Sequence, residues 1–239
     1  MIMIKKFLSA LCIAAFATGF TACNSEDGPD GPVNGSFLDI VTVQSAGSTG
    51  STFTFRSLND SPEITLTTDQ FFEDVSIKSG TRILLNYIPE SGKQFESGPV
   101  RVIGFTRCLG PDITVAKTSN ESEWSSSPVY LAAMWRSGQW LNLQMVLRMS
   151  TSPRRFALVL DPDTEGSDEP ELHIVFTPDV NVNFSSPAYA SYNISSLWDK
   201  PEVEAIKVFY IGLDGQEHSA RIIRDGSTVI KPSDPDKAE

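Results

Sequence analysis

An acidic stretch at residues 161–166 has residue types and a spacing that suit the binding of a cation. It reads Asp-Pro-Asp-Thr-Glu-Gly, and a further acid, Glu171, follows it. Alternate oxygen-bearing side chains ahead of a glycine are typical of the start of a calcium-binding loop, because the turn directs successive carboxylates at one hard cation. Glu171 falls early for the closing ligand, so a polar turn between two strands is the alternative interpretation. The candidate calcium ligands are Asp161, Asp163, Glu165 and Glu171. We expect no other cofactor.

Aromatic side chains suggest a second kind of binding site. Trp140 is predicted to project from the outer face of a strand, whereas Trp198 and Tyr192 lie in or beside loops. Exposed rings on a β-sandwich form a platform on which sugar rings can stack. The alternative is that these rings cover a hinge between two domains or cap the ends of the sandwich. Trp140, Trp198 and Tyr192 are therefore the candidate ligand-binding residues.

The sequence lacks the motifs of the common catalytic mechanisms. Its two histidines, His173 and His218, lie outside any zinc-binding motif, and alternation places His173 on the solvent side of a strand. A Gly-x-Ser-x-Gly elbow and a glycine-rich phosphate loop ahead of a helix are both missing. We predict no catalytic residue.

Cys23 closes an apolar N-terminal run that has the parts of an export signal. Lys5 and Lys6 supply the positive charge, and residues 7–17 supply the apolar region. The tetrad Phe-Thr-Ala-Cys that ends at Cys23 resembles the lipobox of bacterial lipoproteins, with Phe in place of the usual Leu, Val or Ile. We predict a lipoprotein signal peptide over residues 1–22 and a lipid on Cys23. The alternative is an ordinary signal peptide that leaves Cys23 as a free thiol.

The residues after Cys23 and the overall charge limit the choice of partners. Residues 24–36 alternate Gly and Pro with acids and have no apolar periodicity, which predicts a flexible tether over residues 23–36. The chain has a net charge of −11. Because such a chain has no electrostatic attraction to nucleic acid, we expect no nucleic-acid partner. With Cys12 and Cys23 used by the signal and the lipid, Cys108 is expected to be a buried structural thiol.

The folded part is predicted to be all-β. Apolar residues recur with a period of two in short runs separated by Gly, Pro, Ser and Asn, as in antiparallel strands with one buried face. The clearest strand covers residues 140–149, where one face carries Leu141, Leu143, Met145, Leu147 and Met149.

The expected strands form two groups. The first comprises residues 37–43, 52–56, 63–67, 82–88, 100–107 and 113–116. The second comprises residues 129–135, 140–149, 154–160, 171–177, 188–194, 205–211 and 217–223. A polar segment rich in strand breakers separates them at residues 117–128. We predict a barrel over residues 37–117, a sandwich over residues 118–231 and a disordered tail over residues 232–239.

Short motifs in the second half of the chain resemble a known family. They are Pro128-Val129, Met134-Trp135, Gln-Trp-Leu-Asn-Leu at residues 139–143, the strand at residues 154–160, Tyr192 to Leu197, Ile206-Lys207-Val208 and Asp214-Gly215. With the lipobox, they are similar to the NigD-like lipoproteins of Bacteroidota. The resemblance implies an N-terminal OB-like barrel followed by a C-terminal antiparallel β-sandwich, carried on the outer envelope of a gut bacterium. It implies no activity and no catalytic residue.

These observations together predict an outer-membrane lipoprotein that faces the periplasm or the cell surface. We expect it to act as a binding or structural interaction module and not as an enzyme. Its expected contacts are the membrane, through the N-terminal lipid, and an envelope protein or a glycan. The alternatives are a surface glycan-binding protein or an envelope hydrolase that uses loop carboxylates.

Overall fold

A computed structural model describes residues 35–70, 77–110, 112–119, 124–148, 155–178 and 184–224. Cys23, the signal peptide, most of the tether and the tail lie outside these residues. Within them the chain is almost entirely β-structure, as predicted, with one short helix, α1 (Ser195–Trp198), and one 3-10 turn, η1 (Pro162–Thr164). No described helix is long and apolar enough to cross a membrane.

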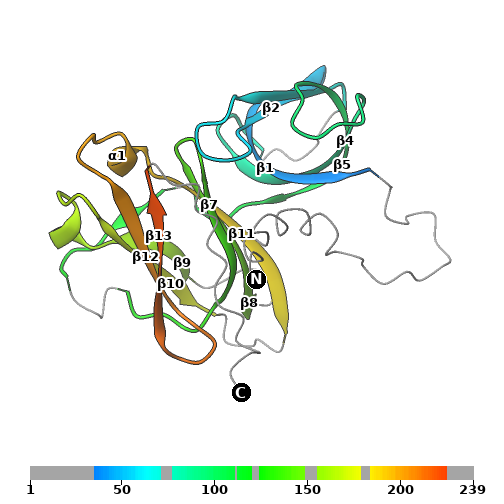
Figure 1. The fold of residues 1–239 in the computed structure, drawn as a ribbon. Coiled ribbons are helices and arrows are strands. Elements are labelled where there is room, and N and C mark those ends of the chain that lie inside the picture. Colours follow the sequence, from blue (N-terminus) through cyan, green and yellow to red (C-terminus); the bar gives the residue numbers. More distant parts are fainter. Residues whose placement is uncertain are drawn as a thin grey trace, which may run out of the picture. The chain divides into compact units, whose positions relative to one another are not determined.

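The first five strands close into a barrel. These are β1 (Phe37–Gly47), β2 (Gly50–Phe55), β3 (Ile64–Thr68), β4 (Arg82–Pro89) and β5 (Gly98–Arg107), in the order β1-β2-β3-β5-β4 (Figure 1). The β3–β5 pair is parallel, and the other pairs are antiparallel. This order is that of an OB-fold barrel. The hairpin between β1 and β2 requires Gly50, because its φ is +123° and a Cβ there would lie 2.3 Å from the carbonyl oxygen of Thr68.

The alternating pattern of each barrel strand places its apolar residues in one shared interior. That interior is formed by Val41, Val43, Phe53, Phe55, Ile64, Leu66, Ile77, Ile83, Leu85, Tyr87, Val100 and Val102. Alternate residues face outward, which is why the strands read as half-buried in the sequence.

The remaining strands form two further sheets. One has the order β13 (Glu217–Ile223), β12 (Ala205–Ile211), β10 (Glu171–Thr177), β9 (Arg155–Leu160) and β6 (Thr114–Val115). The other has the order β11 (Ser185–Asn193), β8 (Trp140–Arg148) and β7 (Tyr130–Ser137). Apolar residues of both sheets make one buried cluster, so the sheets form a sandwich. In β8, Leu141, Leu143, Met145 and Leu147 are all fully buried, which confirms the predicted alternation for the described part of that strand.

The expected strand at residues 113–116 was assigned to the wrong group. It forms β6, which pairs in parallel with β9 through Thr114–Val159 and Val115–Leu160, so it belongs to the sandwich. The chain already leaves the barrel at the end of β5, and Leu109 then exchanges backbone hydrogen bonds with β11 at Tyr189 and Ser191.

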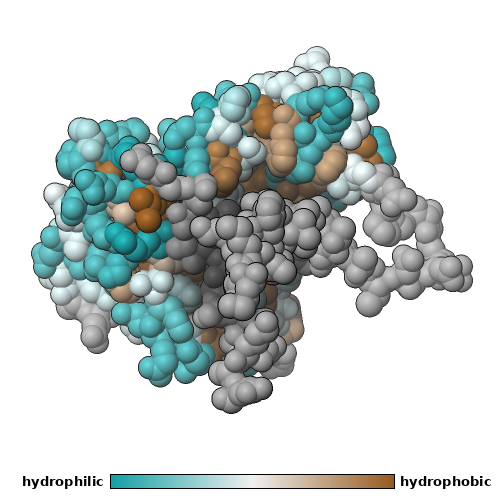
Figure 2. Space-filling view, in the orientation of Figure 1, coloured by the Kyte–Doolittle hydropathy of each residue, from teal (hydrophilic) through white to brown (hydrophobic). Residues whose placement is uncertain are grey.

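The face of the molecule in Figure 2 carries hydrophilic residues over most of its described surface, with hydrophobic residues in smaller groups. The exposed large hydrophobic residues of the described part are spread over many elements. Function is therefore better sought in buried polar groups than in an apolar patch.

Candidate functional site

A buried charge without a carboxylate partner among the described residues belongs to Arg82, the first residue of β4. Its side chain is only 4% exposed. The guanidinium donates from Nε to Ser191 Oγ at 2.9 Å, from Nη1 to Thr42 Oγ1 at 2.8 Å and from Nη2 to Asn142 Oδ1 at 3.2 Å. None of these acceptors is charged. Burial lowers the pKa of Arg82 to about 10, so the group still carries its positive charge at neutral pH.

The partners of Arg82 on β8 and β11 form a polar network that continues to Ser137 at the end of β7. Asn142 and Ser191 are fully buried, and Ser191 Oγ donates to Asn142 Oδ1 at 2.8 Å. Asn142 Nδ2 in turn donates to Ser137 Oγ at 2.8 Å. Because every member is satisfied, the network fixes the position of the guanidinium between a barrel strand and two sandwich strands. The barrel and the sandwich belong to one compact unit, Phe37–Glu239.

The ring of Trp140 lies against the same guanidinium. Arg82 Cζ is 4.6 Å from the centre of the indole, within the range of a cation–π contact. Trp140 starts β8 and is partly exposed.

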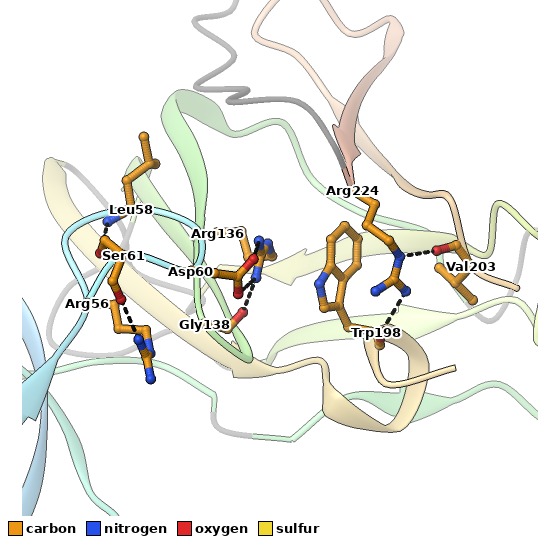
Figure 3. Close-up of polar contacts among 9 residues, drawn as sticks. All are labelled: Arg56, Leu58, Asp60, Ser61, Arg136, Gly138, Trp198, Val203 and Arg224. Atoms are coloured by element: carbon orange, nitrogen blue, oxygen red, sulfur yellow. Dashed lines mark hydrogen bonds and ion pairs between the residues drawn. The ribbon is translucent and has the colours of Figure 1, made fainter. Parts of the chain in front are cut away.

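A second arginine, Arg136 on β7, makes an ion pair with the loop between β2 and β3. Its side chain is 2% exposed and donates to both carboxylate oxygens of Asp60, at 2.8 and 2.6 Å, and to the carbonyl of Gly138 at 2.8 Å (Figure 3). The hydrogen bonds from Arg136 hold the pKa of Asp60 below its usual value. The same loop is joined to β7 by backbone bonds from Asn59 N to Arg136 O and from Gly138 N to Asn59 O.

The indole of Trp198 lies between two guanidinium groups. Arg136 Cζ is 4.8 Å and Arg224 Cζ is 4.7 Å from its ring centre, and Figure 3 shows the ring between them. Arg224 also donates to the carbonyls of Trp198 and Val203. Trp198 is 6% exposed.

Arg82, Arg136 and Asp60 line a polar cavity of about 570 Å³. Its charged lining residues are Arg56, Arg82, Arg136, Asp60, Glu63 and Asp199, and both Trp140 and Trp198 contribute to its wall. Arg82 also lines a second cavity of about 610 Å³ together with Lys78, Arg107 and Cys108. Each cavity is large enough for a small polar molecule.

No family model matches the sequence, and no curated protein matches it. Solved structures do share its fold. A Bacteroides caccae protein described as a NigD-like immunity protein superposes with a TM-score of 0.55 at 14% identity, over 79% of this chain and 97% of its own. The fold is that of a NigD-like protein. The predicted resemblance is thus confirmed at the level of the fold.

Two further Bacteroides structures have the same fold. One, from Bacteroides vulgatus, is a protein of unknown function assigned to DUF1344, with a TM-score of 0.63 and 18% identity over 82% of this chain and 96% of its own. The other is a candidate lipoprotein from Bacteroides fragilis, with a TM-score of 0.54 and 13% identity over 81% of this chain and 99% of its own.

The three predicted aromatic site residues do not form one exposed platform. Tyr192 is 1% exposed in the sandwich core, and Trp198 has guanidinium groups against its ring. The prediction of an exposed ring is wrong for Tyr192, because a ring inside the sandwich core cannot stack on a sugar. Of the three, only Trp140 is partly exposed, whereas both Trp140 and Trp198 contribute to the cavity wall. For Trp198 the structure favours the alternative that the ring caps an end of the sandwich, because the guanidinium groups beside it come from β7 and from the residue after β13 and the ring belongs to the sandwich core.

Cys108 lies at the second cavity and is half-buried. Burial raises the pKa of its thiol to about 12, although the nearby charge of Arg82 acts in the opposite direction. The thiol is therefore protonated at neutral pH and is a poor nucleophile.

The predicted calcium ligands separate into two pairs. Asp163 and Glu165 are exposed in the turn. Asp161 and Glu171 instead lie with His173, and one ligand atom from each of the three falls within 4.8 Å of the other two. His173 was predicted on the solvent side of its strand, but it is 7% exposed because Trp124 packs on it. The signal that was missed is that Glu171 and His173, two residues apart on β10, share one face.

Proposed function

We propose that this chain is a lipid-anchored module of the bacterial cell envelope that binds a small anionic molecule in the cavity beside Arg82. The main support for this proposal is the buried guanidinium of Arg82, whose hydrogen bonds all go to uncharged groups. A buried charge without a counter-charge is costly, and a ligand carboxylate or similar anion at the cavity wall would offset part of that cost.

The composition of the cavity wall narrows the ligand class. Arg136 is neutralised by Asp60, which leaves Arg56 and Arg82 as the cations of the wall that have no carboxylate partner among the described residues. The wall also holds Glu63 and Asp199, whose oxygens accept hydrogen bonds from hydroxyl groups. Trp140 adds a partly exposed ring. A sugar acid, with one carboxylate and several hydroxyls, matches this mixture of groups, and it fits the glycan partner that the sequence suggested.

A hydrolytic role has weaker support. A glycosidase needs a general acid, which is a carboxyl group with a raised pKa at the site. The pKa of Asp60 is lowered by Arg136, whereas burial raises the pKa of Asp39, which does not line this cavity. We therefore propose binding without a catalytic step.

The experiment is isothermal titration of the purified protein with galacturonate and glucuronate oligomers, and with the neutral galactose and glucose oligomers as a comparison. Arg56→Gln should weaken acidic-sugar binding about tenfold or more, because it removes one of the two available cations. Arg101→Gln is the matched control, because Arg101 is an exposed arginine on β5 outside the cavity wall. Equal affinity for acidic and neutral sugars, or equal losses in the two variants, would contradict the proposal.

The membrane anchor is a separate part of the proposal and rests on the lipobox-like tetrad at Cys23. One of the structures with this fold is a candidate lipoprotein, which supports the same location. Metabolic labelling with a palmitate analogue should mark the wild-type chain, and Cys23→Ala should abolish the label. Sucrose-gradient fractions of the labelled cells should place the protein in the outer membrane.

A further inference from the structure

The outer face of the five-stranded sheet carries a buried polar group that the cavity beside Arg82 does not use. On β10, Leu172 and Ile174 point into the sandwich core, so His173 points to the opposite face. That face is not open to solvent around His173. Val159 and Val175 form a small buried cluster there, and Trp124 packs against it.

The imidazole of His173 is held flat between two aromatic rings. Its centre is 4.3 Å from the ring of Trp124 and 4.9 Å from the ring of Phe209, and both interplanar angles are 11°. These contacts occupy the two faces of the ring and leave its edge, where the two ring nitrogens lie. His173 Nε2 is buried and has no hydrogen-bond partner among the described residues. A buried nitrogen in that state calls for a ligand.

Two carboxylates meet this histidine. One oxygen of Asp161, one oxygen of Glu171 and one nitrogen of His173 lie within 4.8 Å of one another. Both acids are half-buried. A zinc ion bound at about 2.0–2.2 Å from each ligand atom would place these atoms about 3.3–3.6 Å from one another. Side-chain movements of about one ångström would therefore complete the site.

We propose that Asp161, Glu171 and His173 bind a divalent transition-metal ion of the zinc type. The imidazole nitrogen favours zinc over calcium, because calcium takes oxygen ligands whereas zinc binds to both nitrogen and carboxylate oxygen. The site is independent of the sugar-acid cavity, since none of its three residues lines that cavity.

Lys207 competes with a metal ion for one of the three ligands. Its Nζ lies 3.3 Å from Glu171 Oε1, so the ammonium group would have to move away from this carboxylate when the ion binds.

The test uses the full-length protein in detergent, after a chelator has removed any bound metal. This protein is titrated in a calorimeter with zinc and, separately, with calcium. We expect zinc to bind at one site and calcium to bind at least about tenfold more weakly. Zinc at about a hundred times its dissociation constant should raise the melting temperature by about 5–10 °C. Cobalt should give the visible absorption of a four- or five-coordinate ion.

Three variants separate this site from surface binding. His173→Phe keeps a flat ring between Trp124 and Phe209 but removes both nitrogens, and it should lose zinc binding. Glu171→Gln, at the half-buried edge, should weaken binding at least tenfold even if the first variant does not fold. Lys207→Met should strengthen binding, because it removes the competing ammonium. The matched control is His218→Gln, which disrupts the exposed pair formed by His218 and Asp214.

The outcomes divide clearly. Loss of zinc binding in His173→Phe and Glu171→Gln, with wild-type binding in His218→Gln, supports the site. Unchanged binding in the first two variants, loss in His218→Gln, or no zinc binding by the wild-type protein overturns it. The zinc results do not test the proposed sugar-acid binding, which is tested separately with Arg56→Gln. That variant is expected to bind zinc like the wild type, so failure of one proposal can be distinguished from failure of the other.

Discussion

Replacing Asp60 by Asn should destabilise the protein in a way that depends on pH. The carboxylate accepts two hydrogen bonds from Arg136, at 2.8 and 2.6 Å, and Asn keeps the shape of Asp but removes its charge. Arg136 would then retain the carbonyl of Gly138 and the ring of Trp198 as partners. Its guanidinium would stay buried without a counter-charge.

The magnitude follows from the unequal burial of the two partners. Exposed ion pairs contribute up to about 1 kcal/mol, whereas breaking a fully buried pair costs about 3–5 kcal/mol. Arg136 is 2% exposed and Asp60 is 78% exposed. Solvent therefore screens one partner only, and we expect Asp60→Asn to lower the free energy of unfolding by about 1–2 kcal/mol near pH 7.

The pH dependence has a definite sign. The pKa of Asp60 is lowered in the folded protein, chiefly by the hydrogen bonds from Arg136. The stabilisation is then complete above the pKa of the unfolded chain and is lost as the pH falls through the folded pKa. The difference between wild type and Asp60→Asn should be largest near neutral pH and should shrink below about pH 4.

Urea unfolding followed by tryptophan fluorescence and circular dichroism at several pH values measures this difference. Glu96→Gln is the matched control, because the Lys93–Glu96 pair is 3.0 Å long but 72% and 46% exposed. It should change the free energy of unfolding by less than about 0.5 kcal/mol. If Asp60→Asn has an equally small effect, or if its effect does not shrink in acid, the assigned role of the Arg136–Asp60 pair is wrong.

Three further changes test other parts of the structure. Asp39→Asn should raise the free energy of unfolding near pH 7, because burial raises the pKa of Asp39 and the wild-type protein loses stability as the pH rises through that pKa. Urea unfolding should show that this gain vanishes in acid. Tyr192→Phe should be neutral or stabilising by up to about 1 kcal/mol in the same assay, because the buried hydroxyl has no partner in the described structure. Gly110→Ala should lower the melting temperature measured by calorimetry, because φ is +110° there and the added Cβ would lie 2.6 Å from the carbonyl oxygen of Ser191. In the control Gly104→Ala the added Cβ meets nothing within 4 Å, so the melting temperature should not fall.

The sequence predicted those strands in which the alternation of apolar and polar residues alone shows which side chains are buried. Along β8 every second side chain is buried, so the period of two was visible without knowledge of the partner strand. Strand β4 of the barrel shows the same regularity, whereas in β1 the successive residues Ile40 and Val41 are both buried. The short strand β6 shows the limit of this reasoning. Its two residues are both exposed and pair with β9 at Val159 and Leu160, far along the chain, so no local pattern could assign it to a sheet.

The candidate site was harder to predict because it depends on contacts distant in sequence. Arg82 opens a strand in the barrel, while Ser191 and Asn142, which accept its hydrogen bonds, lie on two strands of the sandwich. Nothing in the residues next to Arg82 indicates burial. Trp198 and Tyr192 were misplaced for a related reason: one lies in the short helix α1 and the other is covered by the opposite sheet, so neither proximity to a loop nor residue type reported their exposure.

The acidic turn shows how the structure changes a metal hypothesis that the sequence had placed on a loop. The turn satisfies itself, because Asp161 Oδ1 accepts from the backbone of Asp163 and Thr164 Oγ1 accepts from the backbone of Glu171. The exposed carboxylates of Asp163 and Glu165 are not needed for that, so their alternation is explained by solvation.

His173 has no such explanation, because a turn does not require a buried imidazole two residues into the following strand. If the metal is held by the sheet, Asp163→Asn and Glu165→Gln should leave zinc affinity unchanged. If it is held by the loop, as the spacing of the acids alone suggested, these two variants should weaken binding and His173→Phe should not. The two arrangements therefore predict opposite orders of affinity for the same set of variants.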